Sequence, residues 1–118
     1  MISVDMDGVL CEDPTIITGA EYEQFLIEAE PKYTYFEINE IITGRKERFR
    51  EQTEEWLRRH GIKYNKLLML PDEKTLKDIA RWKAEMYKRS ESELFIESDP
   101  RQAEIIKRLT GKHVQEVK

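Results

Sequence analysis

Short apolar runs alternate along the chain with segments in which apolar residues recur every three or four positions. Consecutive aliphatic and β-branched residues are typical of strands that are covered on both faces. The predicted strands start at Ile2 and lie at 40–45, 67–70 and 94–96, with a weaker one at 113–117. The clear runs are short enough to be central, parallel strands of one sheet.

The segments between these runs have the spacing of amphipathic helices. Helices are predicted over 21–30, over 46–60, within 75–90 and from 100 to about 111. Pro31 ends the first, and Gly61 follows the second because glycine readily adopts the left-handed conformation that closes a helix. Pro100 after Ser98-Asp99 is a strong start for the last helix, since proline suits the first turn and either Asp99 or Ser98 can cap it.

This alternation of strand and helix predicts an α/β fold with a doubly wound, mostly parallel sheet and helices on both faces. Residues 1–118 are expected to form one domain, because the chain is long enough for one core and too short for two. Ligands in such folds bind in the crevice outside the carboxyl ends of the strands. Polar residues at strand ends are therefore the candidates for chemistry.

Two segments do not fit either pattern. Residues 9–20 contain proline and glycine and are interpreted as a loop or a small hairpin that begins beside the first strand end and can cover it. Residues 31–36 are aromatic and predict either an extended connection or an edge strand. Tyr33, Tyr35 or Phe36 is expected to add an aromatic wall to the crevice.

Charge and cysteine content exclude several classes of protein. The 20 basic and 24 acidic residues give a net charge of −4, and no basic block is present, so dedicated nucleic-acid binding is not expected. There is no apolar segment long enough for a signal peptide or a membrane span, and one cysteine cannot form an internal disulfide. We expect a cytoplasmic protein that does not bind membranes.

Asp5 and Asp7 stand where the first strand ends at Gly8. Strand alternation places both carboxylates on one side of the backbone, where they repel each other unless a hard divalent cation lies beside them. The sequence therefore indicates half of a metal site. An ordinary Asp-Gly turn with a second aspartate is the structural alternative.

Further polar residues close the other strands. Thr43 ends the second strand and Glu97 ends the strand at 94–96, so both are expected to face the same crevice as the aspartates. Lys83 lies in or beside the apolar stripe of the helix within 75–90, where a side chain reaching along the surface to solvent is the structural alternative. Asp99 has a structural alternative as the N-cap of the last helix.

The order of these residues resembles the four motifs of the haloacid dehalogenase superfamily of phosphotransferases. The matching segments are DMDG at 5–8, IITGR at 41–45, Lys83, and FIESD at 95–99. The resemblance covers essentially the whole chain, and four motifs in order are far more specific than any one of them. It implies a small phosphatase that lacks a cap domain.

The resemblance also implies a role for each residue. Asp5 would attack the phosphorus and form an aspartyl-phosphate. Asp7 would protonate the leaving oxygen and then deprotonate the attacking water. The Thr43 hydroxyl and the Gly44 amide would bind phosphoryl oxygens, and Lys83 would neutralise charge on the phosphoryl group and orient Asp5.

Magnesium is the implied cofactor, bound by Asp5, the main-chain carbonyl of Asp7 and the last acidic motif. The superfamily more often has paired aspartates or a Gly-Asp step where this chain has Glu97-Ser98-Asp99. Glu97, at the strand end, is the expected metal ligand, and Asp99 is the second choice.

The intervals 8–42 and 44–82 are too short to contain a cap domain. A nearly uncovered core implies a phosphorylated small molecule as substrate, a phosphate displayed on a larger molecule, or a site closed by homo-oligomerisation. The substrate itself is not encoded in the motifs, because kinship of fold does not fix function.

Three interpretations are open at this point. The first is a magnesium-dependent phosphomonoester hydrolase. The second is a catalytically weak relative that serves as a metal-binding or regulatory module. The third is a phospho-receiver domain, which also uses acidic residues, a hydroxyl residue and a lysine, but whose lysine comes last, whereas Lys83 precedes Glu97 and Asp99.

Overall fold

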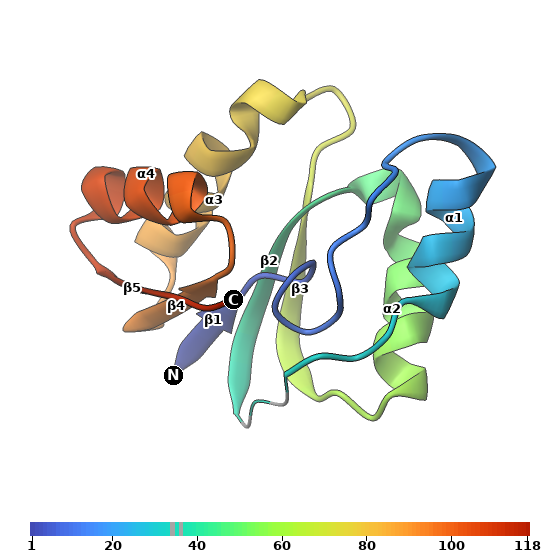
Figure 1. Ribbon diagram of the computed structural model, residues 1–118. Coiled ribbons are helices and arrows are strands. Elements are labelled where there is room, and N and C mark those ends of the chain that lie inside the picture. Colours follow the sequence, from blue (N-terminus) through green and yellow to red (C-terminus); the bar gives the residue numbers. More distant parts are fainter. Residues whose placement is uncertain (34, 36) are drawn as a thin grey trace.

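A five-stranded parallel sheet forms the centre of the protein in the computed structural model, which describes residues 1–33, 35 and 37–118 (Figure 1). The strands are β1 (Ile2–Val4), β2 (Ile38–Lys46), β3 (Tyr64–Leu70), β4 (Leu94–Glu97) and β5 (His113–Glu116). Their spatial order is β3-β2-β1-β4-β5, and every neighbouring pair is parallel. The first strand of the chain is therefore the middle strand of the sheet.

The chain builds the sheet outward from β1 in two directions, first through β2 and β3 and then through β4 and β5. The boundary between β1 and β4 is the topological switch point, next to which ligands of open α/β sheets bind. Val4 pairs with Ile96 there, and the Asp5 amide donates to the Ile96 carbonyl at 3.0 Å. The polar residues after β1 and after β4 are thus brought to one edge.

This strand order tests the third interpretation, that of a phospho-receiver domain. Receiver domains have the flavodoxin-like order 2-1-3-4-5. The order here is 3-2-1-4-5, that of the dinucleotide-binding type of doubly wound sheet. The phospho-receiver interpretation is therefore wrong.

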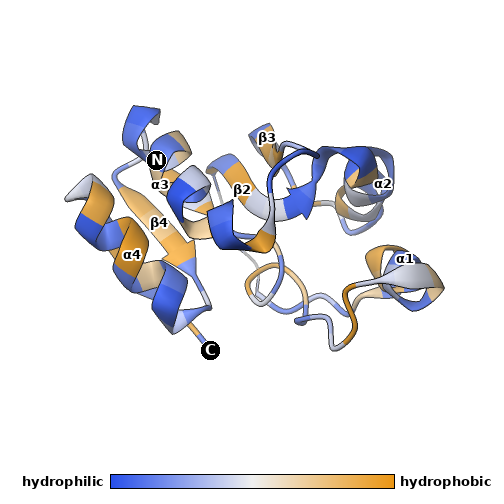
Figure 2. Cartoon of the chain, turned by 90° about the horizontal axis from the view of Figure 1, so that it is seen from above, coloured by the Kyte–Doolittle hydropathy of each residue, from blue (hydrophilic) through white to orange (hydrophobic). Residues whose placement is uncertain are grey.

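Helices cover both faces of the sheet, as the sequence predicts. Helices α1 (Gly19–Glu28) and α2 (Arg50–Arg59) pack together on one face, and α3 (Ile79–Arg89) and α4 (Pro100–Thr110) pack together on the other (Figure 2). The short 3₁₀ turns η1 (Glu47–Phe49) and η2 (Leu76–Asp78) lead into α2 and α3. No helix in the described part of the chain is long and apolar enough to cross a bilayer.

Two apolar clusters lie on opposite faces of the sheet. Ile41 and Ile42 are consecutive in β2, and because successive strand residues point to opposite faces, they belong to different clusters. Ile41 packs in the cluster that contains Trp56 of α2, and Ile42 packs in the cluster that contains Trp82 and Tyr87 of α3. Burial on both faces explains why the strands are continuous apolar runs.

The predicted elements are confirmed, with ends that differ by a few residues. The segments 46–60 and 75–90 each divide into a 3₁₀ turn and an α-helix, and β2 is longer at both ends than its apolar run. Gly61 and Gly111 follow α2 and α4 with φ of 67° and 69°. The Asp99 side chain accepts hydrogen bonds from the amides of Arg101 and Gln102, so the predicted N-cap is present.

The segment after α1 is an extended connection outside the main sheet. Pro31 forms an isolated bridge with Cys11, and the amides of Lys32 and Tyr33 donate to the carbonyls of Leu10 and Val9. The connection therefore braces the loop that follows β1. Phe36, one of the residues expected to form an aromatic wall, lies outside the described residues.

Candidate active site

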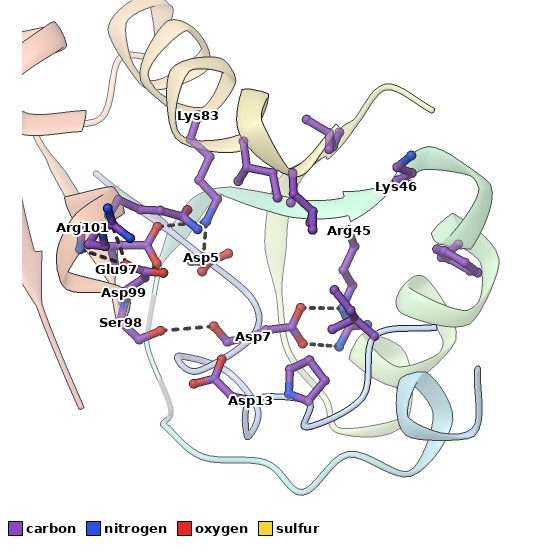
Figure 3. Close-up of a pocket in the computed structure, with 18 of the residues that line it drawn as sticks. Asp5, Asp7, Asp13, Arg45, Lys46, Lys83, Glu97, Ser98, Asp99 and Arg101 are labelled. Atoms are coloured by element: carbon purple, nitrogen blue, oxygen red, sulfur yellow. Dashed lines mark hydrogen bonds and ion pairs between the residues drawn. The ribbon is translucent and has the colours of Figure 1, made fainter. Parts of the chain in front are cut away.

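A cleft of about 760 Å³ runs along the carboxyl edge of the sheet. It is bordered by the ends of β1, β2 and β4, by the loop after β1, and by the first turns of α3 and α4 (Figure 3). Five of the sequence-predicted side chains line it, Asp5, Asp7, Lys83, Glu97 and Asp99, together with Gly44. The topology thus brings the polar strand ends into one crevice, as the motif order predicts.

Lys83 is held between two carboxylates at the floor of the cleft. Its ammonium lies 3.1 Å from Asp5 Oδ2 and 2.9 Å from Glu97 Oε1 (Figure 3). The side chain of Lys83 is only 2% exposed, so the structural alternative of a surface lysine is wrong. The Met6 amide donates to Asp5 Oδ1 at 2.7 Å and fixes the orientation of this carboxylate.

The charges around Lys83 do not cancel. Burial raises the pKa of Asp5 well above its ordinary value, the nearby Glu97 carboxylate raises it further, and the Lys83 ammonium opposes both effects. Burial alone would lower the pKa of Lys83, but Asp5 and Glu97 outweigh it and the pKa is raised. One ammonium therefore serves two buried carboxylates, which leaves a deficit of positive charge at this point of the cleft.

Arg45 binds the carboxylate of Asp7 in a fork. Arg45 Nη2 lies 2.8 Å from Asp7 Oδ1, and Arg45 Nε lies 3.1 Å from Asp7 Oδ2 (Figure 3). The Arg45 side chain is almost wholly buried, and its Nη1 donates to the hydroxyl of Thr53 in α2 at 3.1 Å. The Asp7 side chain, 20% exposed, thus keeps access to the cleft while its direction is fixed.

The turn after Asp7 brings oxygen atoms from three segments together. Gly8 has φ of +85°, and a Cβ atom built on it would lie 2.2 Å from Ser98 Oγ and 2.9 Å from each carboxylate oxygen of Asp13. Ser98 Oγ also donates to the main-chain carbonyl of Asp7 at 3.3 Å (Figure 3). Only glycine fits this corner, because a side chain would displace the oxygens that surround it.

The two acidic residues expected to bind metal have protein partners. Glu97 is fully buried, and its Oε2 accepts from the amides of Ser98 and Asp99 at 3.0 and 3.2 Å, while its Oε1 accepts from Lys83. Asp99 lines the cleft, but its Oδ1 caps α4. Neither side chain presents a free pair of oxygens to a cation.

Thr43 lies deeper than its position at the end of the predicted strand suggests. It is fully buried, and its Oγ1 accepts from the Arg45 amide at 3.1 Å. Strand β2 continues past it to Lys46, so Gly44 and Arg45, not Thr43, line the cleft. The Thr43 hydroxyl stabilises the turn of backbone that presents Arg45.

The rim of the cleft is basic and partly apolar. Lys46, Arg48 and Arg101 line it, together with Ile17 from the loop after β1 and Leu76 from η2, and the last two are exposed. The aromatic side chains among the described lining residues are Tyr22 and Phe49. Tyr33 and Tyr35 pack against each other elsewhere, so the aromatic side of the cleft comes from α1 and η1.

Oxygen atoms that keep some exposure to the cleft can serve a hard divalent cation. The Asp5 carboxylate is paired with Lys83 but is 8% exposed, whereas the Glu97 side chain has no exposed surface. Among the described residues, no group of three or more histidine, cysteine, aspartate or glutamate side chains is arranged to hold a metal ion. Asp5, the Asp7 carbonyl, Ser98 Oγ and Asp13 nevertheless line the cleft or border it at Gly8. Mg²⁺ is usually bound through one or two carboxylates and keeps several waters, so this mixed donor set fits it.

Comparisons with known proteins show the fold of the chain but not its family. No family model matches the sequence, and no curated protein matches it. A chain of the Pnkp1/Rnl/Hen1 complex aligns with 98% of this chain at a TM-score of 0.70 and 18% identity. A chain of the Pnkp1/Rnl/Hen1 RNA repair complex aligns with 98% at a TM-score of 0.69 and 19% identity. This chain spans 45% and 41% of the length of those two chains.

The sequence predicts no part in the site for Arg45, Asp13 or Ser98, which all line the cleft in the structure. Arg45 directly follows Thr43-Gly44. Its position at the end of a strand, facing the same crevice as the two aspartates, is the sequence signal that could identify it as their partner. Asp13 lies in the loop after β1, where the sequence does not determine the direction of a side chain. Ser98 stands between Glu97 and Asp99, the two residues that the motif implies as metal ligands.

Proposed function

We propose that this protein is a magnesium-dependent phosphomonoester hydrolase of the haloacid dehalogenase type, acting through an aspartyl-phosphate. The observation that carries this proposal is the ion pair of 3.1 Å between Lys83 Nζ and Asp5 Oδ2 at the floor of an open cleft, beside the carboxylate of Asp7. A nucleophilic carboxylate, a cation to neutralise the phosphoryl group and a second carboxylate for proton transfer are the parts that this reaction needs.

In the proposed reaction, Asp5 attacks the phosphorus, and the bond to the leaving oxygen breaks as the new Asp5–phosphorus bond forms. Asp7 donates a proton to the leaving oxygen, then takes one from the water that attacks the aspartyl-phosphate, which restores Asp5 and releases phosphate. Lys83 offsets the negative charge on the equatorial oxygens in both steps.

Positioning is supplied by the residues around these three. The fork of Arg45 directs the Asp7 carboxylate, and the Met6 amide fixes Asp5. Gly44 lines the cleft, and its amide is the proposed donor to a phosphoryl oxygen. The buried Thr43 hydroxyl acts on the phosphoryl group only if a small shift of β2 exposes it.

A divalent cation bound near Asp5 and the Asp7 carbonyl would supply positive charge that draws the phosphate in and keeps Asp5 ionised. Burial and the nearby Glu97 raise the pKa of Asp5, and such a cation would oppose both effects and favour the charged form that attacks phosphorus.

The substrate class follows from the openness of the cleft. No separate domain covers it within the described residues, so the phosphate can belong to a small molecule or protrude from a larger one. Lys46, Arg48 and Arg101 on the rim suit a substrate with additional negative charge. Because both structural neighbours come from Pnkp1/Rnl/Hen1 assemblies, one of them described as an RNA repair complex, oligoribonucleotides with terminal phosphates belong in the substrate panel.

A metal-binding or regulatory module with weak catalysis is the second candidate. The observation that favours weak catalysis is the engagement of Glu97 and Asp99 with protein donors, because these side chains are then not free to bind a catalytic cation as the motif implies. Turnover separates the two candidates.

The test is phosphate release from an aryl phosphate, nucleotides, sugar phosphates and phosphorylated oligonucleotides, with magnesium and with EDTA. Asp5→Asn is compared with Glu104→Gln, which removes an exposed carboxylate from α4. We expect magnesium-dependent release that is lost in Asp5→Asn and kept in Glu104→Gln. Release retained by Asp5→Asn contradicts the mechanism, and no release from any substrate by a protein that binds magnesium favours the second candidate.

A further inference from the structure

The end of β4 does not supply the carboxylate that a cation beside Asp5 and the Asp7 carbonyl would need. Glu97 accepts hydrogen bonds from Lys83 Nζ and from two backbone amides and has no exposed surface. Its carboxylate is thus committed to holding Lys83 against Asp5. The residue that follows it, Ser98, has only a hydroxyl to offer.

The loop after β1 supplies a carboxylate from the opposite side. Asp13 lines the same cleft, and both of its carboxylate oxygens lie 2.9 Å from the point beside Gly8 that a Cβ atom would occupy. Ser98 Oγ lies 2.2 Å from that point and 3.3 Å from the Asp7 carbonyl oxygen. Figure 3 shows the Asp13 carboxylate next to that carbonyl. Oxygens of three segments therefore converge where glycine leaves room.

The balance of charge also selects Asp13. Asp7 is neutralised by Arg45, and Lys83 can neutralise only one of Asp5 and Glu97. Asp13 forms no ion pair within the described residues, where Lys32 donates to the Gly8 carbonyl at 3.3 Å instead. Asp99 also forms no ion pair in that part of the chain which the structure describes, but its carboxylate caps the N-terminus of α4. The uncompensated negative charge therefore lies on Asp13 and on one of Asp5 and Glu97, and one divalent ion would compensate it.

A buried oxygen atom without a hydrogen-bond donor belongs to a residue that lines the same cleft. Gln102 Oε1, in the first turn of α4, has no hydrogen-bond partner among the described residues. Buried acceptors are rarely left without a donor, and waters of a hydrated Mg²⁺ are donors. Because α4 begins directly after β4, Gln102 lies on the β4 side of the cleft.

We propose that Asp13, together with the Asp7 carbonyl and Ser98 Oγ, binds the divalent cation beside Asp5, in place of Glu97 and Asp99. This inference rests on the proposed function, since it names the ligands of the cation which that function requires. The acidic ligand then comes from the loop at residues 9–18 and not from the strand end where the sequence motif predicts it. Glu97 becomes a positioning residue for Lys83.

The test measures cation binding without turnover. Mn²⁺ is titrated into the full chain and followed by electron paramagnetic resonance, with Mg²⁺ as competitor. The variants are Asp13→Asn and Ser98→Ala, and the matched control is Asp99→Asn, which removes one negative charge from the same cleft but can still cap α4 because asparagine is an equally good N-cap. Circular dichroism confirms that each variant is folded, which is expected because Asp13 is exposed on a loop.

Asp13→Asn should weaken Mn²⁺ binding by about tenfold or more, and Ser98→Ala by less, as for other losses within a metal site. Asp99→Asn should change the affinity by no more than about twofold, the effect of one exposed charge at a distance. The ligand assignment is wrong if Asp13→Asn binds Mn²⁺ as tightly as wild type, or if Asp99→Asn loses more affinity than Asp13→Asn. In either case the phosphatase proposal stands as long as wild type binds the ion. No Mn²⁺ or Mg²⁺ binding by wild type at millimolar concentrations overturns both.

Discussion

Arg45 holds both carboxylate oxygens of Asp7, with Nη2–Oδ1 at 2.8 Å and Nε–Oδ2 at 3.1 Å, while its own side chain is almost wholly buried. The pair joins the end of β2 to the turn after β1, so the direction of Asp7 depends on the neighbouring strand. Aspartate at this position is thus held by a planar fork that lysine cannot reproduce.

Replacing Arg45 with lysine should therefore damage turnover more than binding. In Arg45→Lys one ammonium cannot contact both oxygens of Asp7, and we expect kcat to fall by about two orders of magnitude, the usual contribution of a positioned general acid. KM for an aryl phosphate should change little, and the pH profile of kcat should shift. Arg48→Lys, on the exposed rim, is the control. Equal losses in kcat and in substrate affinity would contradict a positioning role.

Asp5→Asn should abolish turnover without loss of stability. Asparagine keeps an acceptor for the Met6 amide but cannot attack phosphorus, so activity should fall by at least about 10³-fold. Burial of Asp5 raises its pKa, hence replacing it with a neutral amide removes an unfavourable buried charge. Thermal unfolding should show an equal or higher Tm, and mass spectrometry should detect no phosphorylated protein. A marked fall in Tm would show that the Asp5 carboxylate is needed for the fold.

Lys83→Met should destabilise the protein, because Asp5 and Glu97 then face each other in a buried site with no cation. Breaking a buried ion pair by removing one partner costs about 3–5 kcal/mol, and denaturant unfolding measures this loss. Lys88→Met removes an exposed lysine from the same helix and should have little effect. A loss as small as that of the control would contradict the role of Lys83 at the centre of this cluster.

The loss in Lys83→Met should also depend on pH when unfolding is measured in EDTA. The pKa of Asp5 is already raised in the folded protein, and removing Lys83, which opposes this effect, raises it further. A carboxyl whose folded pKa exceeds its unfolded value favours the folded state when protonated, and this contribution disappears as pH rises through the folded pKa. The difference in unfolding free energy between variant and wild type should therefore be smaller in acid than near neutrality. A constant difference over that range would contradict the coupling.

Gly8→Ala should cost more than an ordinary glycine replacement. Gly8 and Gly61 both have positive φ, at 85° and 67°, so alanine is strained at either position by about 1–2 kcal/mol. At Gly61 nothing lies within 4 Å of an added Cβ, whereas at Gly8 the Cβ meets Ser98 Oγ and Asp13. Urea unfolding should show a larger loss for Gly8→Ala than for Gly61→Ala, and Mn²⁺ affinity should fall only in the former. Equal effects would show that the corner beside Gly8 is not a binding site.

The architecture of the fold could be predicted from the sequence because both faces of the sheet are buried. Ile41-Ile42 and 67–70 are continuous apolar runs, and Asp99-Pro100 marks a helix start that the structure contains. Lys83 lies in α3, and only the resemblance of the motif order indicated its place in the site. The convergence of Asp5 and Glu97 followed from topology, since the carboxyl edge of a doubly wound sheet collects residues from distant segments. The position of a residue at a strand end was sufficient for these predictions.

The partners of individual side chains could not be predicted in the same way. Glu97 and Thr43 stand at strand ends, yet Glu97 turns to Lys83 and the amides of α4, and Thr43 is buried because β2 continues beyond it. The approach of Asp13 depends on the path of a loop that is braced by the connection after α1. Such choices depend on tertiary contacts, and a pattern of apolar and polar positions does not encode them.

The central position of β1 has a consequence for folding. Its residues are the first of this segment to be synthesised, but Val4 pairs with Ile41 and with Ile96, which follow much later. Pairing between such distant residues gives a high contact order, and loop closure must precede it. Asp5 therefore meets Lys83 and the two strands beside β1 only after the segment up to β4 has been synthesised, so this carboxylate stays without its ammonium partner until late in the synthesis of the domain.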